Sequence, residues 1–183
     1  MNTTVSSGNN AQRYHRLSIA LHWLMALLLI AVYVTMEFRS IFPKGSDARS
    51  AMKMWHFMLG LSVLSLLIIR LAVRFTTTAP PILPTPPSWQ LSLSKLIHLA
   101  LYGFMLAMPI AGWLILSGEG ARIPFFGLEL PALISPDKEL AHQIEDIHGA
   151  VGEFFYYVIG LHVVAALFHH YFVKDNTLKR MLP

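Results

Sequence analysis

The stretch from His148 to Phe172, HGAVGEFFYYVIGLHVVAALFHHYF, decides the fold that we predict for this chain. Its residues 154–173 contain no Asp, Glu, Lys or Arg, and a spanning helix needs roughly 20 such residues. His148 and His162 are fourteen positions apart, which on one helix is roughly 21 Å of rise and within about 40° of the same face. Because an intramembrane histidine is costly without a partner, the stretch predicts a membrane helix with a functional group near each side.

The remainder of the chain has the composition of a membrane protein. Of its 183 residues 55% are hydrophobic and only 13% charged, and the mean hydropathy is +0.53. Residues 17–36 and 96–118 are further windows without charge, and a shorter one, 54–69, ends at Arg70. Arg70 and Arg74 can snorkel to the interface and let that helix reach about Val73. We predict an all-α fold, an integral membrane four-helix bundle.

The ends of this predicted domain follow from composition. Residues 1–12 are polar and rich in Asn, Ser and Thr, and we expect a disordered tail before a four-helix domain over residues 13–183. The first apolar run is too long for a signal-peptide core, so we expect it to be retained as a helix. The chain has no cysteine, which excludes disulfides, iron–sulfur clusters and haem attached through thioethers. Five prolines in residues 79–87 predict an extended strap.

Charge counting orients the bundle. With the N-terminus inside, the inner segments hold eight Lys and Arg residues and the outer segments six, and the positive-inside rule favours the side with more. Both termini are then cytoplasmic. In this frame His56 and His148 lie near the outer ends of their helices, and His22 and His162 lie at the inner level. Ligands for a buried cofactor come from facing helices of a bundle in this way.

A small residue follows each of these histidines by one helical turn. The four are Ala26, Gly60, Gly152 and Ala166. A porphyrin spreads over the neighbouring turn of its ligand's helix, so the pattern favours haem over a bare zinc ion, which would also need ligands at one depth. Close helix packing is the alternative explanation, since membrane helices approach each other at Gly and Ala.

Three segments of the chain resemble the bacterial cytochrome b561 family. They are YHRLSIALHWL at 14–24, VYVTMEFR at 32–39 and GLHVVAALFHHYFVKDNTL at 160–178. The resemblance implies a multi-pass protein of the bacterial inner membrane with two non-covalent b-type haems. Their iron axial ligands would be His22, His56, His148 and His162. The similarity is greatest to the branch that oxidises superoxide and passes the electrons through both haems to ubiquinone. The implied partners are superoxide, ubiquinone and the lipid bilayer, and no nucleic acid.

Charged and titratable side chains mark where the two substrates would meet the bundle. The outer loop supplies Arg39, Lys44, Arg49 and Lys53 against Asp47 alone, and such a basic patch raises the local concentration of an anion. Pairing with haem propionates and membrane anchoring are its alternative roles. At the inner side His169, His98 and Lys95 are the candidates for a quinone site, because histidines relay protons near neutral pH. Lys95 and Arg70 are also candidates for holding propionates.

Two other functions fit parts of this pattern. An electron-transfer cytochrome b subunit would take electrons from a periplasmic redox protein and deliver them to the quinone pool. A transporter or metal carrier would use the histidines as ion ligands, and a single absorption spectrum would distinguish it from a haem protein.

Overall fold

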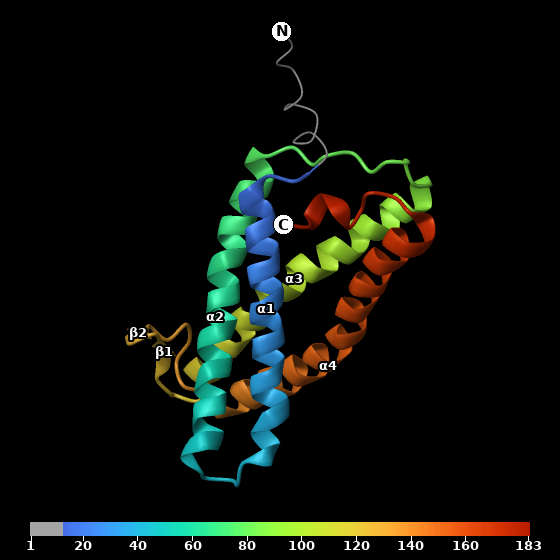
Figure 1. The fold of residues 1–183 in the computed structure, drawn as a ribbon. Helices are drawn as coiled ribbons and strands as arrows, with labels where there is room; N and C mark the ends of the chain where they lie inside the picture. The colour runs from blue at the N-terminus through green and yellow to red at the C-terminus, as the bar shows by residue number, and fades with distance from the viewer. Residues whose placement is uncertain (1–12) are drawn as a thin grey trace.

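The computed structural model describes residues 13–183 and consists of four long helices with a small β-hairpin (Figure 1). The expected disordered tail, residues 1–12, lies outside the described part. The long helices are α1 (Arg16–Glu37), α2 (Asp47–Thr76), α3 (Ser88–Gly118) and α4 (Lys138–Phe168). All four are long and apolar enough to cross a membrane, as the sequence predicted.

The helices alternate in direction, so the connections gather at two ends of the bundle (Figure 1). The termini end holds the start of α1, the C-terminal residues and the α2–α3 strap, and corresponds to the side predicted to be inner. The loop end holds the α1–α2 connection, with the 3₁₀ turn η2 (Phe38–Ile41), and the α3–α4 connection. Helix α1 packs on α2, α3 on α4, and α2 on α3. Each helix therefore packs on the helix that follows it in the chain, as in an up-and-down bundle.

Each helix extends beyond its predicted apolar window, because polar residues form its ends. Helix α2 begins at Asp47 rather than near Met54, since the Ser46 side chain accepts the backbone N–H of Arg49 at 3.3 Å and caps the first turn. Helix α4 begins in the same way, with Asp137 Oδ1 accepting from Leu140 N at 3.0 Å. The apolar windows therefore report the membrane-spanning part of each helix and not its full length.

The bundle buries few side chains and exposes many apolar ones. One buried cluster joins Met25 on α1 to Val63 and Leu67 on α2, and a second joins Leu61 and Leu116 to the hairpin residue Ile123. Large apolar side chains such as Phe75 and Leu99 are 85% and 69% exposed. Contiguous exposed apolar surface marks an interaction with lipid or protein, and hydrocarbon covers it in a membrane.

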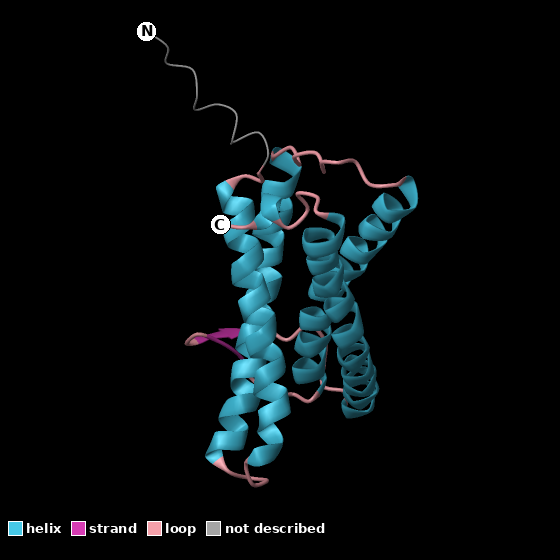
Figure 2. Ribbon diagram, turned by 45° about the vertical axis from the view of Figure 1, so that its right-hand side comes forward, coloured by secondary structure: helices cyan, strands magenta, loops and turns pink. Residues whose placement is uncertain are grey.

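The connection between α3 and α4 contains a hairpin that the sequence did not predict. Strands β1 (Ile123–Phe125) and β2 (Leu128–Leu130) pair antiparallel, with Ile123 opposite Leu130 (Figure 2). Phe126 and Gly127 at its tip have φ values of 48° and 87°, the left-handed conformation that a tight hairpin turn requires. Because Ile123 is buried against Leu61 and Leu116, the hairpin fixes the loop end of the bundle.

Candidate functional site

The structure brings His56 of α2 and His148 of α4 together toward the loop end of the bundle. Their ring centroids are 6.1 Å apart and the rings are inclined by 74°. His56 Nδ1 lies 3.2 Å from the carbonyl oxygen of Val32 on α1. A carbonyl only accepts, so His56 Nδ1 carries the proton and Nε2 keeps its lone pair. Metal-binding histidines are held in this way by a hydrogen bond from their other nitrogen.

The other ring of this pair, His148, has a polar atom without a hydrogen bond in the described residues. Its Nδ1 is buried and has no hydrogen-bond partner within residues 13–183. Buried polar atoms without partners are uncommon in folded proteins and often mark a functional site. In the loop-end pair, a backbone carbonyl therefore orients His56, whereas His148 Nδ1 has no hydrogen-bond partner among the described residues.

An apolar cavity of about 240 Å³ lies beside this pair and is lined by both rings. Cofactor sites are mostly apolar clefts with a few placed polar groups, and this one has the two imidazoles. Four glycines line it: Gly60, Gly112, Gly149 and Gly152. A Cβ built on Gly60 would meet nothing within 4 Å, and one on Gly152 only the Met108 side chain at 3.7 Å. The two small residues that follow His56 and His148 by one turn thus border open space.

A second pair lies toward the termini end, where His22 of α1 faces His162 of α4. Their centroids are 6.3 Å apart and the rings are inclined by 72°, close to the arrangement of the first pair. The sequence-derived pairing by depth, His56 with His148 and His22 with His162, matches these two contacts. Both His148 and His162 belong to α4, so one helix contributes a ring to each pair.

A cation and a third histidine flank the termini-end pair. Arg70 of α2 donates from Nη1 to the carbonyl oxygen of Ser18 at 3.1 Å, and its Nη2 lies 3.4 Å from His22 Nδ1. His98 of α3 has its centroid 5.4 Å from that of His162, and its Nδ1 donates to the Ser94 carbonyl at 2.6 Å. Of the candidates for a quinone site, His98 is thus the one in contact with this pair. Lys95 is exposed on the same helix.

His169, the remaining quinone candidate, bonds to the carboxylate of Asp175 and, within the described residues, is not paired with another histidine ring. It lies in η3 (His169–Val173), a π-helical turn that continues α4, and its Nδ1 is 2.5 Å from Asp175 Oδ2. The spacing along α4 predicted His169 below the inner site but did not indicate this partner. The signal was present, since Asp175 is the single acid among the charged residues assigned to the inner side.

The predicted basic patch in the α1–α2 loop divides into two kinds of residue. Lys44 and Lys53 are exposed, and Arg39 is partly buried. Arg49 is also partly buried, and its Nη1 donates to the carbonyl oxygens of Arg39 and Phe42 at 3.3 and 3.0 Å. Arg49 therefore holds the loop together, and the two lysines carry its freely accessible charge.

A tyrosine–acid group beside the loop-end cavity was not predicted from the sequence. Tyr156 donates to Glu37 Oε1 at 2.6 Å, Tyr33 donates to the Gly152 carbonyl at 2.8 Å, and the centroids of the two tyrosine rings are 4.3 Å apart. All three side chains line the cavity. They tie the end of α1 to α4, and so fix the spacing between the helices that surround the loop-end pair.

The spacing of both histidine pairs suits haem iron. A metal bound by two opposite imidazoles holds each nitrogen at about 2 Å, which with the half-widths of the rings places the centroids about 6 Å apart. The observed separations of 6.1 and 6.3 Å agree with this geometry. Within residues 13–183 no group of three or more His, Cys, Asp and Glu side chains is arranged to hold a bare metal ion. The separation in each pair is therefore the one expected of two imidazoles that share one metal atom.

Comparison with known proteins gives concordant matches over nearly the full chain. A family model described as prokaryotic cytochrome b561 matches residues 13–183. Cytochrome b561 homolog 1 of Escherichia coli K12 is 37% identical over 171 residues, which cover 93% of this chain and 97% of the relative. A probable superoxide oxidase, CybB of Yersinia pestis, is 37% identical over 172 residues, 94% and 97% of the two chains. Cytochrome b561 homolog 2 of Escherichia coli K12 is 28% identical over 186 residues, with coverage of 97% and 95%.

Proposed function

This chain belongs to the prokaryotic cytochrome b561 family, and from that premise we propose that it oxidises superoxide and reduces ubiquinone across the bacterial inner membrane. The family implies b-type haem, electron transport and transmembrane helices. The observation that carries the proposal is that α4 contributes one ring to each of two histidine pairs. His148 pairs with His56, and His162 pairs with His22. A relative named probable superoxide oxidase supports the choice of electron donor.

The proposed ligands are His56 and His148 for one haem and His22 and His162 for the other. Two b-type haems bound there would supply a one-electron path from the loop end to the termini end. Two superoxide anions each give up one electron and leave as dioxygen. One ubiquinone takes up both electrons with two protons and leaves as ubiquinol. In this proposal the termini end, with Arg70, Lys174 and Arg180, faces the cytoplasm.

The side chains act on the two substrates through charge and proton supply. Lys44 and Lys53 would attract superoxide to the loop end, because exposed cations raise the encounter rate of a small anion. Arg70, beside His22, is placed to balance negative charge at the termini-end site. His98 of α3 contacts that site, and His169 lies seven residues beyond His162 in the turn that continues α4. We assign the proton supply for ubiquinone to His169.

Replacing Lys44 and Lys53 by Gln should slow haem reduction by superoxide. We expect the second-order rate constant at low salt to fall by about threefold, and the difference to disappear at high salt, because exposed charges are screened over about 10 Å at 0.1 M. Stopped-flow mixing of purified protein with superoxide measures this rate. The matched control replaces Lys174 and Lys179, which are exposed at the opposite end, and should leave the rate unchanged. Equal effects of the two double variants would refute steering by the loop.

His169→Ala should impair delivery of electrons to ubiquinone without affecting their uptake. After reduction by superoxide at the wild-type rate, we expect the haems to be reoxidised by ubiquinone at least about tenfold more slowly, since a positioned proton donor contributes 10²-fold or more. His142→Ala is the control, because His142 is an exposed histidine in the first turns of α4. Wild-type reoxidation in His169→Ala would remove this residue from the site and make His98 the next to replace.

A further inference from the structure

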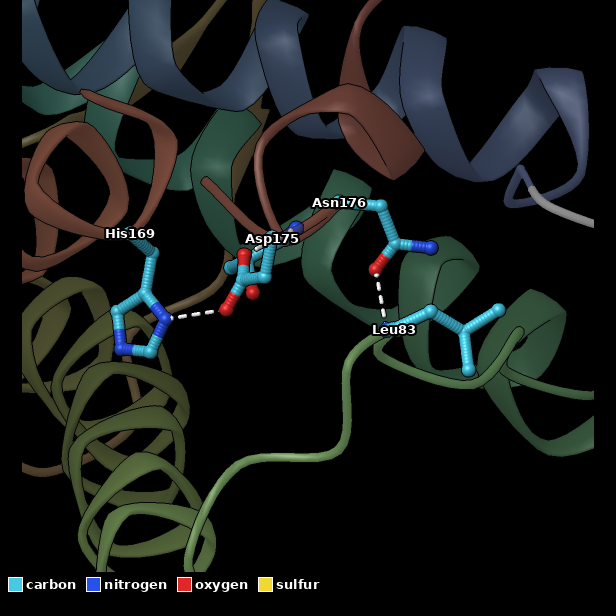
Figure 3. Close-up of polar contacts among 5 residues, drawn as sticks. Leu83, His169, Asp175 and Asn176 are labelled. Atoms are coloured by element: carbon cyan, nitrogen blue, oxygen red, sulfur yellow. Dashed lines mark hydrogen bonds and ion pairs between the residues drawn. The ribbon is translucent and has the colours of Figure 1, made fainter. Parts of the chain in front are cut away.

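Residues 174–183 fold back across the termini end of the bundle, and we call this segment the C-terminal hook. The hook begins at Lys174, which has a left-handed backbone with φ of 61°. This turn directs Asp175 back toward η3, where its backbone N–H bonds the His169 carbonyl at 3.2 Å. Figure 3 shows the Asp175 carboxylate pointing at the His169 ring. Asp175 is only 1% exposed, although charged side chains are seldom fully buried.

Both oxygens of this buried carboxylate are occupied. Oδ2 accepts from His169 Nδ1 at 2.5 Å, and Oδ1 accepts from the backbone N–H of Thr177 at 2.8 Å. Burial by itself would raise the pKa of Asp175, but the hydrogen bonds from His169 and Thr177 outweigh it and hold the pKa below its ordinary value. Asp175 is therefore an ionised acceptor with two fixed donors.

The hook itself is held from two sides, so the carboxylate cannot easily turn away. Asn176 Oδ1 accepts from Leu83 N at 2.8 Å, and Asn176 N donates to the Leu83 carbonyl at 3.1 Å, which fastens the hook to the strap (Figure 3). Arg180 donates to the carbonyl of Pro80 and accepts, through its own carbonyl, from Tyr14 N. A functional side chain is positioned well when the residues that support it are themselves fixed.

An ionised carboxylate that accepts from Nδ1 sets the tautomer of the imidazole. His169 must keep its proton on Nδ1 in both its neutral and charged forms, so Nε2 is the nitrogen that gains and loses a proton. The ring remains 17% exposed, which leaves a route for protons from water. Within residues 13–183 no other cationic group of this end makes an ion pair with an acid, Arg70, Lys95 and Arg180 included, and the His169–Asp175 pair is the one found there.

We propose that Asp175 is a positioning residue for quinone reduction, which orients His169 so that its Nε2 hands a proton to the nearer quinone oxygen. The inference rests on the function proposed above and adds the residue on which its proton step depends. For each quinone, two electrons arrive from the bundle, one proton passes from Nε2 to the quinone oxygen nearest His169, and the other oxygen takes its proton from water. After its transfer His169 is the neutral Nδ1–H imidazole, still bonded to Asp175, and it is reprotonated at Nε2 by water from the termini end.

Asp175→Asn tests this assignment. The two donors, His169 Nδ1 and Thr177 N, each need an acceptor oxygen, and an amide has only one. If that oxygen keeps the Thr177 N–H, the amide NH₂ faces His169 Nδ1 and makes it an acceptor. The single proton of the neutral ring then lies on Nε2, which cannot donate it without forming an imidazolate. We expect haems reduced by superoxide to be reoxidised by ubiquinone-1 at least about tenfold more slowly in this variant, with a larger solvent deuterium isotope effect.

Two internal comparisons separate this role from a structural one. Ferricyanide takes one electron and no proton, so it should reoxidise Asp175→Asn at the wild-type rate. Asn176→Ala breaks the side-chain bond between hook and strap but keeps the carboxylate and the tautomer of His169, so it should slow the ubiquinone reaction less than Asp175→Asn does and leave the isotope effect unchanged. Asp175→Glu keeps the negative charge but displaces the carboxylate, so its rate of reoxidation by ubiquinone-1 should lie between those of the wild type and Asp175→Asn. If Asp175→Asn does not fold, the Glu variant is measured in its place.

Three results would overturn the assignment in different ways. Equal slowing in Asp175→Asn and Asn176→Ala, with an unchanged isotope effect, would mean that Asp175 only fastens the hook, and would leave the proposed function intact. Wild-type protein that is reoxidised by ferricyanide but not by ubiquinone-1 would contradict the proposed function, and the role of Asp175 with it. Wild-type ubiquinone kinetics in Asp175→Asn would refute the positioning role alone.

Discussion

Purified His148→Ala protein is expected to retain one haem b per chain, against two in the wild type. Removing this ring leaves His56 without the partner whose centroid lies 6.1 Å away, and a low-spin haem held by two histidines then loses one axial bond. The pair formed by His22 and His162 is unchanged, so the remaining haem should keep its six-coordinate spectrum. Pyridine haemochrome analysis counts the haems, and the visible spectrum reports the coordination of the one that remains.

The matched control for this variant is His142→Ala on the same helix. His142 is exposed, and within residues 13–183 its ion-pair partners are Glu145 and Asp146, each at 4.0 Å, so we expect two haems in that protein. Retention of both haems in His148→Ala would exclude His148 as a ligand. Loss of both haems from a bundle that is still folded would show that the histidines are paired differently.

Gly60→Leu should displace the loop-end haem nearly as effectively as loss of a ligand. Gly60 lines the cavity beside His56 and His148, and a Cβ added there meets no atom within 4 Å. The protein alone therefore has room for a Cβ at this position, and the rest of the Leu side chain would extend into the space assigned to the porphyrin. We expect about one haem per chain, measured by pyridine haemochrome, with an intact helical bundle by circular dichroism.

Gly103→Leu controls for the change in helix composition. Gly103 is exposed on α3, has no atom within 4 Å of the position that a Cβ would take, and is not among the residues that line the cavity. Both substitutions replace Gly by a better helix former, so any difference between them reports the cavity. Two haems with normal spectra in Gly60→Leu would return this glycine to a role in helix packing.

The number of helices and the pairing of the histidines were accessible from the sequence for physical reasons. A bilayer requires about 20 apolar residues for each span, so the uncharged windows located the four helices. Alternating direction then fixed the depth of every histidine along its helix. Depth alone paired His22 with His162 and His56 with His148, because rings at different levels cannot meet.

The details that the sequence did not reveal depend on contacts between distant segments or on local backbone conformation. The Asn176–Leu83 bonds join positions 93 residues apart, and no periodic pattern signals them. Arg49 was predicted to be a surface charge, but it bonds carbonyls that only the folded α1–α2 loop brings together. The β1–β2 hairpin has three residues in each strand, which is too short for an alternating pattern to stand out.

The most direct test of the account is the haem content of the wild-type protein, because every proposed step depends on two cofactor sites at two depths. Pyridine haemochrome analysis of protein purified in detergent should give two haem b per chain, both low-spin and six-coordinate in the visible spectrum. One haem per chain in fully loaded protein would contradict the two-site arrangement and, with it, the proposed electron path from superoxide to ubiquinone.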